Sequence, residues 1–175
     1  ESLAVRAATE LERKQAEEKL QFAASIYAET HEGIMLTDTN AIIVDVNPGF
    51  CTITGYSSEE VIGKNASFLS SDRQSKAFFT QMWGALKAEG TWRGEIWNRT
   101  KSGILYAELL TISALLDDNN ELINYVGIFS DITLAKKQQQ SLEYLAHYDV
   151  LTGLPNRTLF ADRFSQAIAR SKREE

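Results

Sequence analysis

The sequence has a single cysteine, Cys51, and only two histidines, His31 and His147, among its 175 residues. One cysteine excludes an intrachain disulfide and a cysteine-based metal cluster. No group of histidine, cysteine and carboxylate side chains has the spacing of metal ligands, so we predict no metal site. No apolar run approaches the roughly 18 residues that a membrane-spanning helix requires, so we predict no membrane segment in this chain.

Basic side chains are few and scattered. The chain has 18 Lys and Arg against 24 Asp and Glu, a formal net charge of -6. Because phosphate binding needs clustered Lys and Arg, we predict no nucleic-acid partner. The sequence also lacks an initiator methionine and a signal-peptide pattern. We therefore expect a cytoplasmic fragment of a longer protein, and whether that parent is anchored to a membrane stays open.

Residues 1–28 have the composition of an exposed helix, rich in Ala, Glu, Lys, Gln and Leu and without Pro or Gly. A lone amphipathic helix of this length cannot bury an apolar stripe against itself. We predict a linker helix whose stripe either packs on the following domain or pairs with a second copy as a coiled coil. The stripe consists of Leu3, Ala7, Leu11, Leu20, Ala24 and Tyr27.

Residues 29–133 change to short β-type runs separated by turn residues. Turns are predicted at residues 39–40, 100–103 and 117–120, where Thr, Asn, Asp, Ser and Gly gather. With the helices described next, the predicted order is β-β-α-α-α-β-β-β. The five predicted strands are residues 33–38, 41–46, 91–99, 104–114 and 122–132.

Three helices, two short and one longer, are predicted between the second and third strands. Asn47 followed by Pro48 is an N-cap residue before a proline at the first helical position, and this helix is predicted to end at Gly55. Residues 57–60, SSEE, form a capping box that opens the next helix. Residues 74–88 carry Phe, Met, Trp and Leu on one side of a longer third helix.

A second linker helix is predicted for residues 134–148, which are rich in Gln and Lys and carry Leu134, Leu142 and Leu145. A folded domain would therefore stand between two exposed helices. Such a layout suits a relay of signals better than a self-contained enzyme.

The middle of the chain resembles a PAS domain. The resemblance covers about a hundred residues, with its motifs in the order that the family shows. It implies an α+β fold, a five-stranded antiparallel sheet with short helices on one face and a central pocket. It also implies a signal hinge at Asp131, Ile132 and Thr133, where the last strand passes into the second linker helix. The motifs are DVNPGF at 45–50, TGYS at 54–57, EVIG at 60–63, WRGE at 92–95, NRTKSG at 98–103 and DIT at 131–133.

Residues 149–157, DVLTGLPNR, resemble the entry signature of GGDEF domains, which condense two GTP molecules into cyclic di-GMP. The resemblance covers residues 149–175 only, and the G-G-[DE]-E-F motif is absent. We therefore expect a truncated start of that domain and no enzymatic activity in this chain. Diguanylate cyclase activity is expected of the full-length parent only, and a following phosphodiesterase domain stays open.

PAS domains carry haem, flavins, small acids or nothing, and the residues present eliminate some of these. Haem iron needs an axial ligand, usually His. His31 precedes the first strand and His147 lies beside the GGDEF signature, so neither is on the long helix where haem-binding PAS domains place their ligand. We therefore predict that the domain does not carry haem.

Residues 63–69, GKNASFL, match the G-x-N-C-R-F-L motif of the light-sensing LOV branch. Ala66 stands where the photoreactive Cys belongs, and without a thiol no cysteinyl-flavin adduct can form. Asn98 matches a flavin-contacting Asn of that branch, whereas Glu108 stands in place of a second Asn. Phe129 replaces the Gln that senses flavin chemistry. We therefore exclude a LOV photocycle.

An FAD-binding redox sensor remains, because residues 92–99 resemble the corresponding strand of FAD-carrying regulators. Period-two alternation places Trp92, Gly94 and Asn98 on one strand face, where an aromatic wall and an amide could meet a flavin ring. The alternative is that Trp92 is a core aromatic and Asn98 caps the following hairpin. The pocket would then be empty or take another small molecule. A carboxylate at Glu108 would be costly on an inward face unless it were paired.

From these resemblances we predict the sensory and regulatory module of a bacterial cyclic di-GMP signalling protein. The candidate pocket residues are Ala66, Trp92, Asn98, Glu108 and Phe129. The two linker helices would pack as coiled-coil arms of a parallel homodimer. A change in the pocket would then bring two downstream GGDEF domains face to face or hold them apart.

Overall fold

The computed structural model describes residues 3–161 and residue 163. The chain divides into two units between Ile132 and Thr133, and each is described by itself. The elements of the first unit are α1 (Leu3–Glu29), β1 (Gly33–Thr37), β2 (Ile43–Val46), α2 (Pro48–Thr54), α3 (Ser58–Val61), the 3-10 helix η1 (Ala66–Leu69), α4 (Lys76–Glu89), β3 (Thr91–Arg99), β4 (Leu105–Leu116) and β5 (Leu122–Asp131). The second unit begins with α5 (Thr133–His147).

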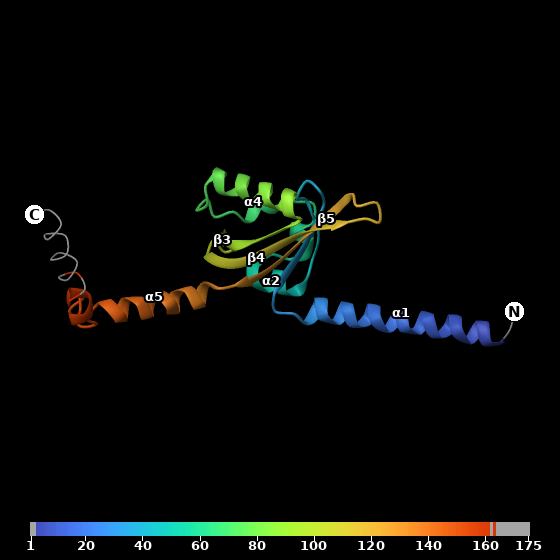
Figure 1. Ribbon diagram of the computed structural model, residues 1–175, viewed down its shortest axis with the longest axis horizontal. Helices are drawn as coiled ribbons and strands as arrows, with labels where there is room; N and C mark the ends of the chain where they lie inside the picture. The colour runs from blue at the N-terminus through green and yellow to red at the C-terminus, as the bar shows by residue number, and fades with distance from the viewer. Residues whose placement is uncertain (1–2, 162, 164–175) are drawn as a thin grey trace, which may run out of the picture. The chain divides into compact units, whose positions relative to one another are not determined.

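The five strands form one antiparallel sheet in the order β2-β1-β5-β4-β3. The first strand therefore lies beside the last, and the helices α2, α3, η1 and α4 fill the crossover from β2 to β3. Figure 1 shows α4 lying along β3 and β4. The predicted fold class, α+β with a five-stranded antiparallel sheet, is confirmed.

The turns form for the chemical reasons that the sequence indicates. Asp38 Oδ1 accepts hydrogen bonds of 2.8 Å from the backbone N–H groups of Asn40 and Ile42. Asp117 Oδ1 does the same for Asn119 and Glu121, at 2.9 and 2.8 Å. These short Asx turns fix the connections between β1 and β2 and between β4 and β5.

The helices begin and end close to the predicted positions. The Asn47 side chain caps α2 by accepting from Phe50 N, and Gly55 ends the helix with φ of 77°, a left-handed conformation that favours glycine. In the capping box, Ser57 N donates to the Glu60 carboxylate at 2.9 Å. Helix α4 begins two residues later than predicted because Ser75 is its cap. The short helix η1 was not predicted.

Asn47 joins three parts of the chain, a role beyond capping. Its Oδ1 accepts from Ile34 N at 2.7 Å and from Phe50 N at 2.9 Å. Its Nδ2 donates to the carbonyl groups of Tyr27 and Glu32 at 3.1 and 2.9 Å. The side chain is fully buried. The end of α1, the start of β1 and the start of α2 therefore meet at one amide.

Gly49, two residues further on, packs against the same connection. A Cβ atom at this position would lie 2.2 Å from the Glu32 carbonyl oxygen and 2.9 Å from that of Thr30. Only glycine allows α2 to approach the backbone so closely. We call Asn47, Gly49 and the backbone of residues 30–32 the α1 anchor.

Helix α1 reaches the domain through its last turn, where the Tyr27 hydroxyl donates to Asp45 Oδ2 at 2.8 Å. Within the predicted stripe, Leu11 and Leu20 are exposed in the single chain, at 58% and 72% accessible, whereas Tyr27 is half-buried. Packing of these two side chains on the domain, one of the two predicted alternatives, is therefore not seen. Pairing with a second copy stays a prediction.

In the second unit, α5 is amphipathic but has no buried residue among those described. After it, Asp149 Oδ1 accepts from Thr152 N and Thr152 Oγ1, at 2.9 and 2.8 Å. Asn156 Nδ2 donates to the Ala146 carbonyl at 2.8 Å, and its Oδ1 accepts from Leu159 N at 3.0 Å. Of the predicted start of a GGDEF domain at 149–175, residue 162 and residues 164–175 lie outside the described part. No helix within the described residues has the length and apolar character that crossing a bilayer requires.

Candidate functional site

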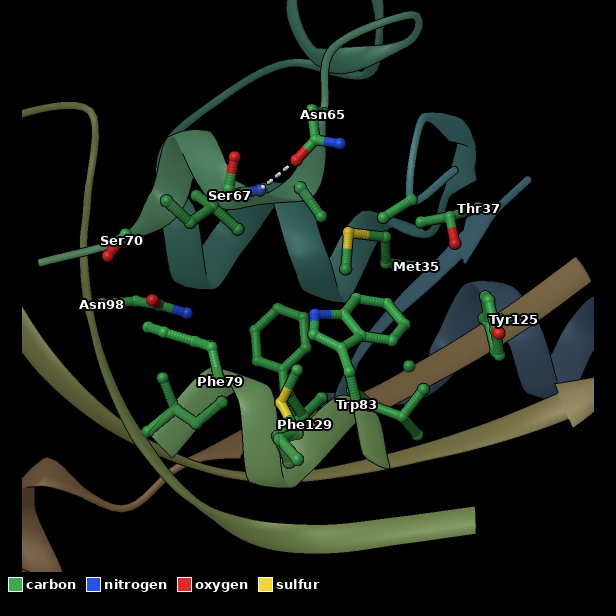
Figure 2. A pocket seen from close by; sticks show the side chains of 18 of the residues that line it. Met35, Thr37, Asn65, Ser67, Ser70, Phe79, Trp83, Asn98, Tyr125 and Phe129 are labelled. Atoms are coloured by element: carbon green, nitrogen blue, oxygen red, sulfur yellow. Dashed lines mark hydrogen bonds between the residues drawn. The ribbon is translucent and has the colours of Figure 1, made fainter. Parts of the chain in front are cut away.

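A cavity of about 500 Å³ lies between the inner face of the sheet and the helices. Strands β1, β3, β4 and β5 form its floor, and α4 and the segment around η1 contribute its other walls. Figure 2 shows side chains from these elements directed into one space. The residues that line it include Met35, Thr37, Asn65, Ala66, Phe79, Met82, Trp83, Lys87, Ile96, Asn98, Glu108, Leu110, Tyr125, Gly127 and Phe129.

Aromatic and sulfur-containing side chains make the walls mainly apolar. Phe79, Met82 and Trp83 come from one side of α4, because residues three and four apart share a helix face. Figure 2 shows the Trp83 indole and the Asn98 amide directed into the same space. The Trp83 ring contacts Tyr125 of β5 edge to face at 5.5 Å between ring centroids. The cavity therefore suits a ligand with a flat apolar body.

The polar end of the cavity consists of Asn98 on β3 and Glu108 on β4. Both are buried, with Glu108 only 2% exposed. Asn98 Nδ2 donates to Glu108 Oε1 at 3.0 Å. The alternative that Asn98 caps the following hairpin is wrong, because Thr100 Oγ1 accepts from Ile104 N there, at 3.1 Å. Both candidate residues therefore face the cavity.

One buried acceptor at this end has no partner. Glu108 Oε2 and the buried hydroxyl of Tyr106, two residues away on the same strand face, make no hydrogen bond of good geometry, although the hydroxyl lies close enough to act on the carboxyl. Burial raises the pKa of Glu108 from 4.5 to about 7. The Tyr106 hydroxyl and the Asn98 amide oppose this rise, and the charge of Asp131 adds to it. An unpaired buried carboxyl is costly, and a ligand that bonded to it would relieve the cost.

The raised pKa of Glu108 predicts how stability depends on pH. Between about pH 4.5 and 7 Glu108 keeps its proton in the folded state but releases it in the unfolded state. The free energy of unfolding therefore falls as the pH rises through this range, and the loss is complete above about pH 7. The rise from 4.5 to about 7 corresponds to about 3 kcal/mol. Urea unfolding should give E108Q and the wild type the same free energy of unfolding near pH 4.5. At pH 8 E108Q should be about 3 kcal/mol more stable than the wild type.

The exposed Glu59 provides the matched control. E59Q should follow the wild type at both pH values, because its carboxyl stays in water. If the difference between E108Q and the wild type did not change with pH, Glu108 would not be a buried acid.

Ala66 and Phe129 also line the cavity, so four of the five predicted pocket residues lie along it. Trp92, the fifth, is not among the lining residues. Its ring lies over Gly94, where a Cβ atom would be only 2.4 Å from Trp92 Cζ2, and it contacts Phe78 edge to face. The predicted alternation is right, but Trp92 fills the space above Gly94 that the sequence interpretation left for a ligand. Whether the other four bind a ligand stays a prediction.

Phe129 connects the cavity wall with the start of β1. Its ring lies over Gly33, where an added Cβ atom would be 2.2 Å from Phe129 Cζ. The next residue, Ser130, donates from Oγ to Glu32 Oε1 at 2.8 Å. Residues 131–133, the predicted hinge, follow directly, and the Ile132 N–H donates to the Ala107 carbonyl at 2.9 Å. The wall of the cavity thus adjoins the α1 anchor and the end of β5.

The rare residues Cys51, His31 and His147 are not among those lining the cavity. Cys51 is a free, half-buried thiol that packs against the core. Among the described residues, no group of three or more His, Cys, Asp or Glu could hold a metal ion.

Comparison with known families agrees with this architecture. A model described as PAS domain matches residues 31–134, more than half of the chain. The chain belongs to the PAS domain family. The match spans the sheet, the cavity and the predicted hinge of this PAS domain, and it ends before residues 149–157. The GGDEF resemblance of those residues therefore stays a prediction.

Relatives of this PAS domain occur in regulators and photoreceptors. It is 33% identical over 109 residues to a nitrogen fixation regulatory protein of Klebsiella oxytoca, covering 62% of this chain and 22% of the relative. It is 37% identical over 114 residues to a blue-light photoreceptor of Listeria innocua, covering 63% and 45%. The chain thus spans less than half the length of both relatives.

A solved structure shows the same fold. The crystal structure of the PAS domain of a protein from Colwellia psychrerythraea superposes with a TM-score of 0.62 at 27% identity, covering 66% of this chain and 98% of that one. The match therefore covers almost the whole of the solved domain, and about a third of this chain lies outside it.

Proposed function

We propose that this chain is the sensory module of a bacterial cyclic di-GMP signalling protein. The observation that carries the proposal is the cavity with a buried, unpaired carboxyl beside the strand that leads into α5. A ligand in this cavity would touch Phe129, Asn98 and Glu108. Glu108 lies on β4 and Phe129 on β5, and the start of β4 pairs with the end of β5, where the predicted hinge begins.

The output assigned to the module rests on residues 149–157, DVLTGLPNR. They follow α5 directly, so a change at the hinge would reach a GGDEF domain through a single helix. The relatives in signalling and photoreceptor proteins support a sensory role without favouring this output. The chain itself has no G-G-[DE]-E-F motif. Synthesis of cyclic di-GMP would belong to the longer protein.

Incubation with GTP and Mg²⁺ tests the proposed output. The isolated chain should form no cyclic di-GMP, whereas the full-length protein that contains it should form the product. Product from the isolated chain would overturn the assignment of this chain as a sensor, and its absence from the full-length protein would overturn the assignment of the output.

We further propose that the module works as a homodimer through α1 and α5. Apolar side chains on both helices are exposed in the single chain, among them Leu11, Leu20, Leu142 and Leu145. PAS domains commonly dimerise, and two opposed GGDEF domains would supply the two GTP molecules that the reaction needs. Sedimentation of the chain at tens of micromolar should give a dimer, and a monomer would contradict this arrangement.

A second candidate function is an FAD-binding redox sensor. The residues present fit a flavin better than the sequence indicated, because Trp83 and Phe79 supply the aromatic walls that Trp92 does not. The Asn98 amide and the unpaired Glu108 Oε2 could meet the polar, amide-like edge of the ring. A bound flavin would supply reversible electron transfer. Flavin absorbance bands in the purified protein would support this function, and a colourless protein without extractable flavin would remove it.

A further inference from the structure

Glu108 faces the cavity and the predicted hinge at the same time. In the β4–β5 ladder it stands directly opposite Asp131, the last residue of β5. Side chains directly opposite in an antiparallel pair share a face and have their Cβ atoms about 5 Å apart. The neighbouring backbone hydrogen bond runs from Ile132 N to the Ala107 carbonyl at 2.9 Å, one residue before α5 begins.

We propose that Glu108 is a charge relay that couples the contents of the cavity to the β5–α5 junction. When Glu108 is neutral, the carboxyl and Asp131 stand opposite each other without repulsion. When Glu108 ionises and its proton passes to water, two negative charges face each other across the end of the ladder. Their repulsion weakens the pairing that holds Ile132 and loosens the start of α5.

The relay assigns a chemical class to the ligand that signals, and in this it rests on the proposed sensory function. Glu108 Oε1 already accepts from Asn98, whereas Oε2 lacks a partner, so we expect a ligand to bond to Oε2. A neutral ligand with an N–H donor at the end of an apolar body would stabilise the ionised carboxylate and loosen the junction. A ligand with only an acceptor would bind the neutral acid and leave the junction paired.

Few other polar or titratable groups near Glu108 could make the β5–α5 junction depend on charge. Asn98 faces it from β3, Tyr106 from β4 and Asp131 from β5. Lys87 of α4 lines the same cavity and is exposed. Burial raises the pKa of Tyr106 above its ordinary value, so this phenol stays neutral in the neutral pH range. Within the described residues, the pair of Glu108 and Asp131 is therefore where a charge change at the end of the ladder would act.

Hydrogen exchange of the whole chain tests the relay with protons alone as the probe. Exchange of the backbone amides of residues 131–134 is measured at pH 5.5 and pH 8.5 and corrected for the intrinsic pH dependence. In the wild type the opening equilibrium of these amides should rise about fourfold, the factor for two unit charges about 5 Å apart in a water-like dielectric. In E108Q and in D131N it should not change.

Two results would overturn the relay. One is a wild-type junction whose corrected exchange does not depend on pH. The other is an unchanged pH response in both E108Q and D131N, which would show that other groups produce it. E59Q, on the exposed surface, should respond as the wild type does. If the relay failed while ligands or cavity-filling residues still altered the junction, the proposed sensory function would survive without Glu108 as its carrier.

Discussion

Replacement of Gly49 by alanine should destabilise the domain by about 3 kcal/mol, at the upper end of the usual cost of an added methyl group in a packed place. The added Cβ atom would meet the carbonyl oxygens of Glu32 and Thr30 at 2.2 and 2.9 Å. Both are backbone atoms of the connection between α1 and β1, so neither can move without displacing a strand or a helix. Urea unfolding of G49A followed by circular dichroism measures the loss.

Gly84 provides the matched control. It lies within α4, and a Cβ atom there would have nothing within 4 Å. Alanine is the better helix former, so G84A should stabilise the domain by about 1 kcal/mol. Equal stabilities of G49A and G84A would contradict the close approach at Gly49. If G49A fails to fold while G84A folds, the prediction is met in its strongest form.

Replacement of Asn47 by alanine should cost about 4 kcal/mol, because four hydrogen bonds of about 1 kcal/mol each are lost in a buried place. The variant would leave buried donors on Ile34 and Phe50 and acceptors on Tyr27 and Glu32 without their partner. The last turn of α1 should also detach, since its link to the amide disappears. Calorimetry measures the first effect, and hydrogen exchange of residues 26–32 measures the second.

An exposed asparagine shows what the same substitution does without the network. Asn119 lies in the turn between β4 and β5, where its side chain contacts only Asp117, at 3.5 Å. N119A should change stability by less than about 0.5 kcal/mol. A loss of only about 1 kcal/mol in N47A, the usual value of a helix cap, would show that Asn47 acts only as a cap and that the α1 anchor is not a network.

The fold was predictable because local signals are strong in this chain. Asn47-Pro48, the capping box at residues 57–60, and the glycines at 55 and 90 each mark a helix end for a reason that acts within one turn. Period-two alternation likewise placed Asn98 on the inner face of β3. Boundaries shifted by one or two residues where a cap such as Ser75 decided them.

The composition of the cavity was less predictable. Apolar residues at helical spacing on α4 predict a buried face, but periodicity cannot distinguish a side chain that fills the core from one that lines a hollow. Trp83 was therefore missed, and Trp92 was assigned to the pocket although its ring covers Gly94. Only the packing of α4 against the sheet decides which of the two tryptophans reaches the cavity.

The long-range pairings were beyond the sequence altogether. Asp131 lies 23 residues after Glu108, and only the register of β4 against β5 places the two side chains opposite each other. The same holds for Asn47, whose partner atoms come from α1, β1 and α2. A one-residue change in the register of β5 against β4 would place Asp131 on the opposite face of the sheet from Glu108.

The most direct test of the central claim imitates occupancy of the cavity. Gly127 of β5 lines the cavity and has room for a Cβ atom, which would lie 3.5 Å from Leu110 Cδ1. Ile128, the next residue, points to the exposed outer face. G127F would fill the cavity, and I128F places the same ring on the other side of the same strand.

Hydrogen exchange of the amides of residues 131–134 should be compared in G127F, I128F and the wild type at one pH. Our account predicts that G127F changes the opening equilibrium of these amides, whereas I128F leaves it as in the wild type. Equal exchange in all three proteins, with G127F folded, would contradict the claim that the contents of the cavity are transmitted to the start of α5.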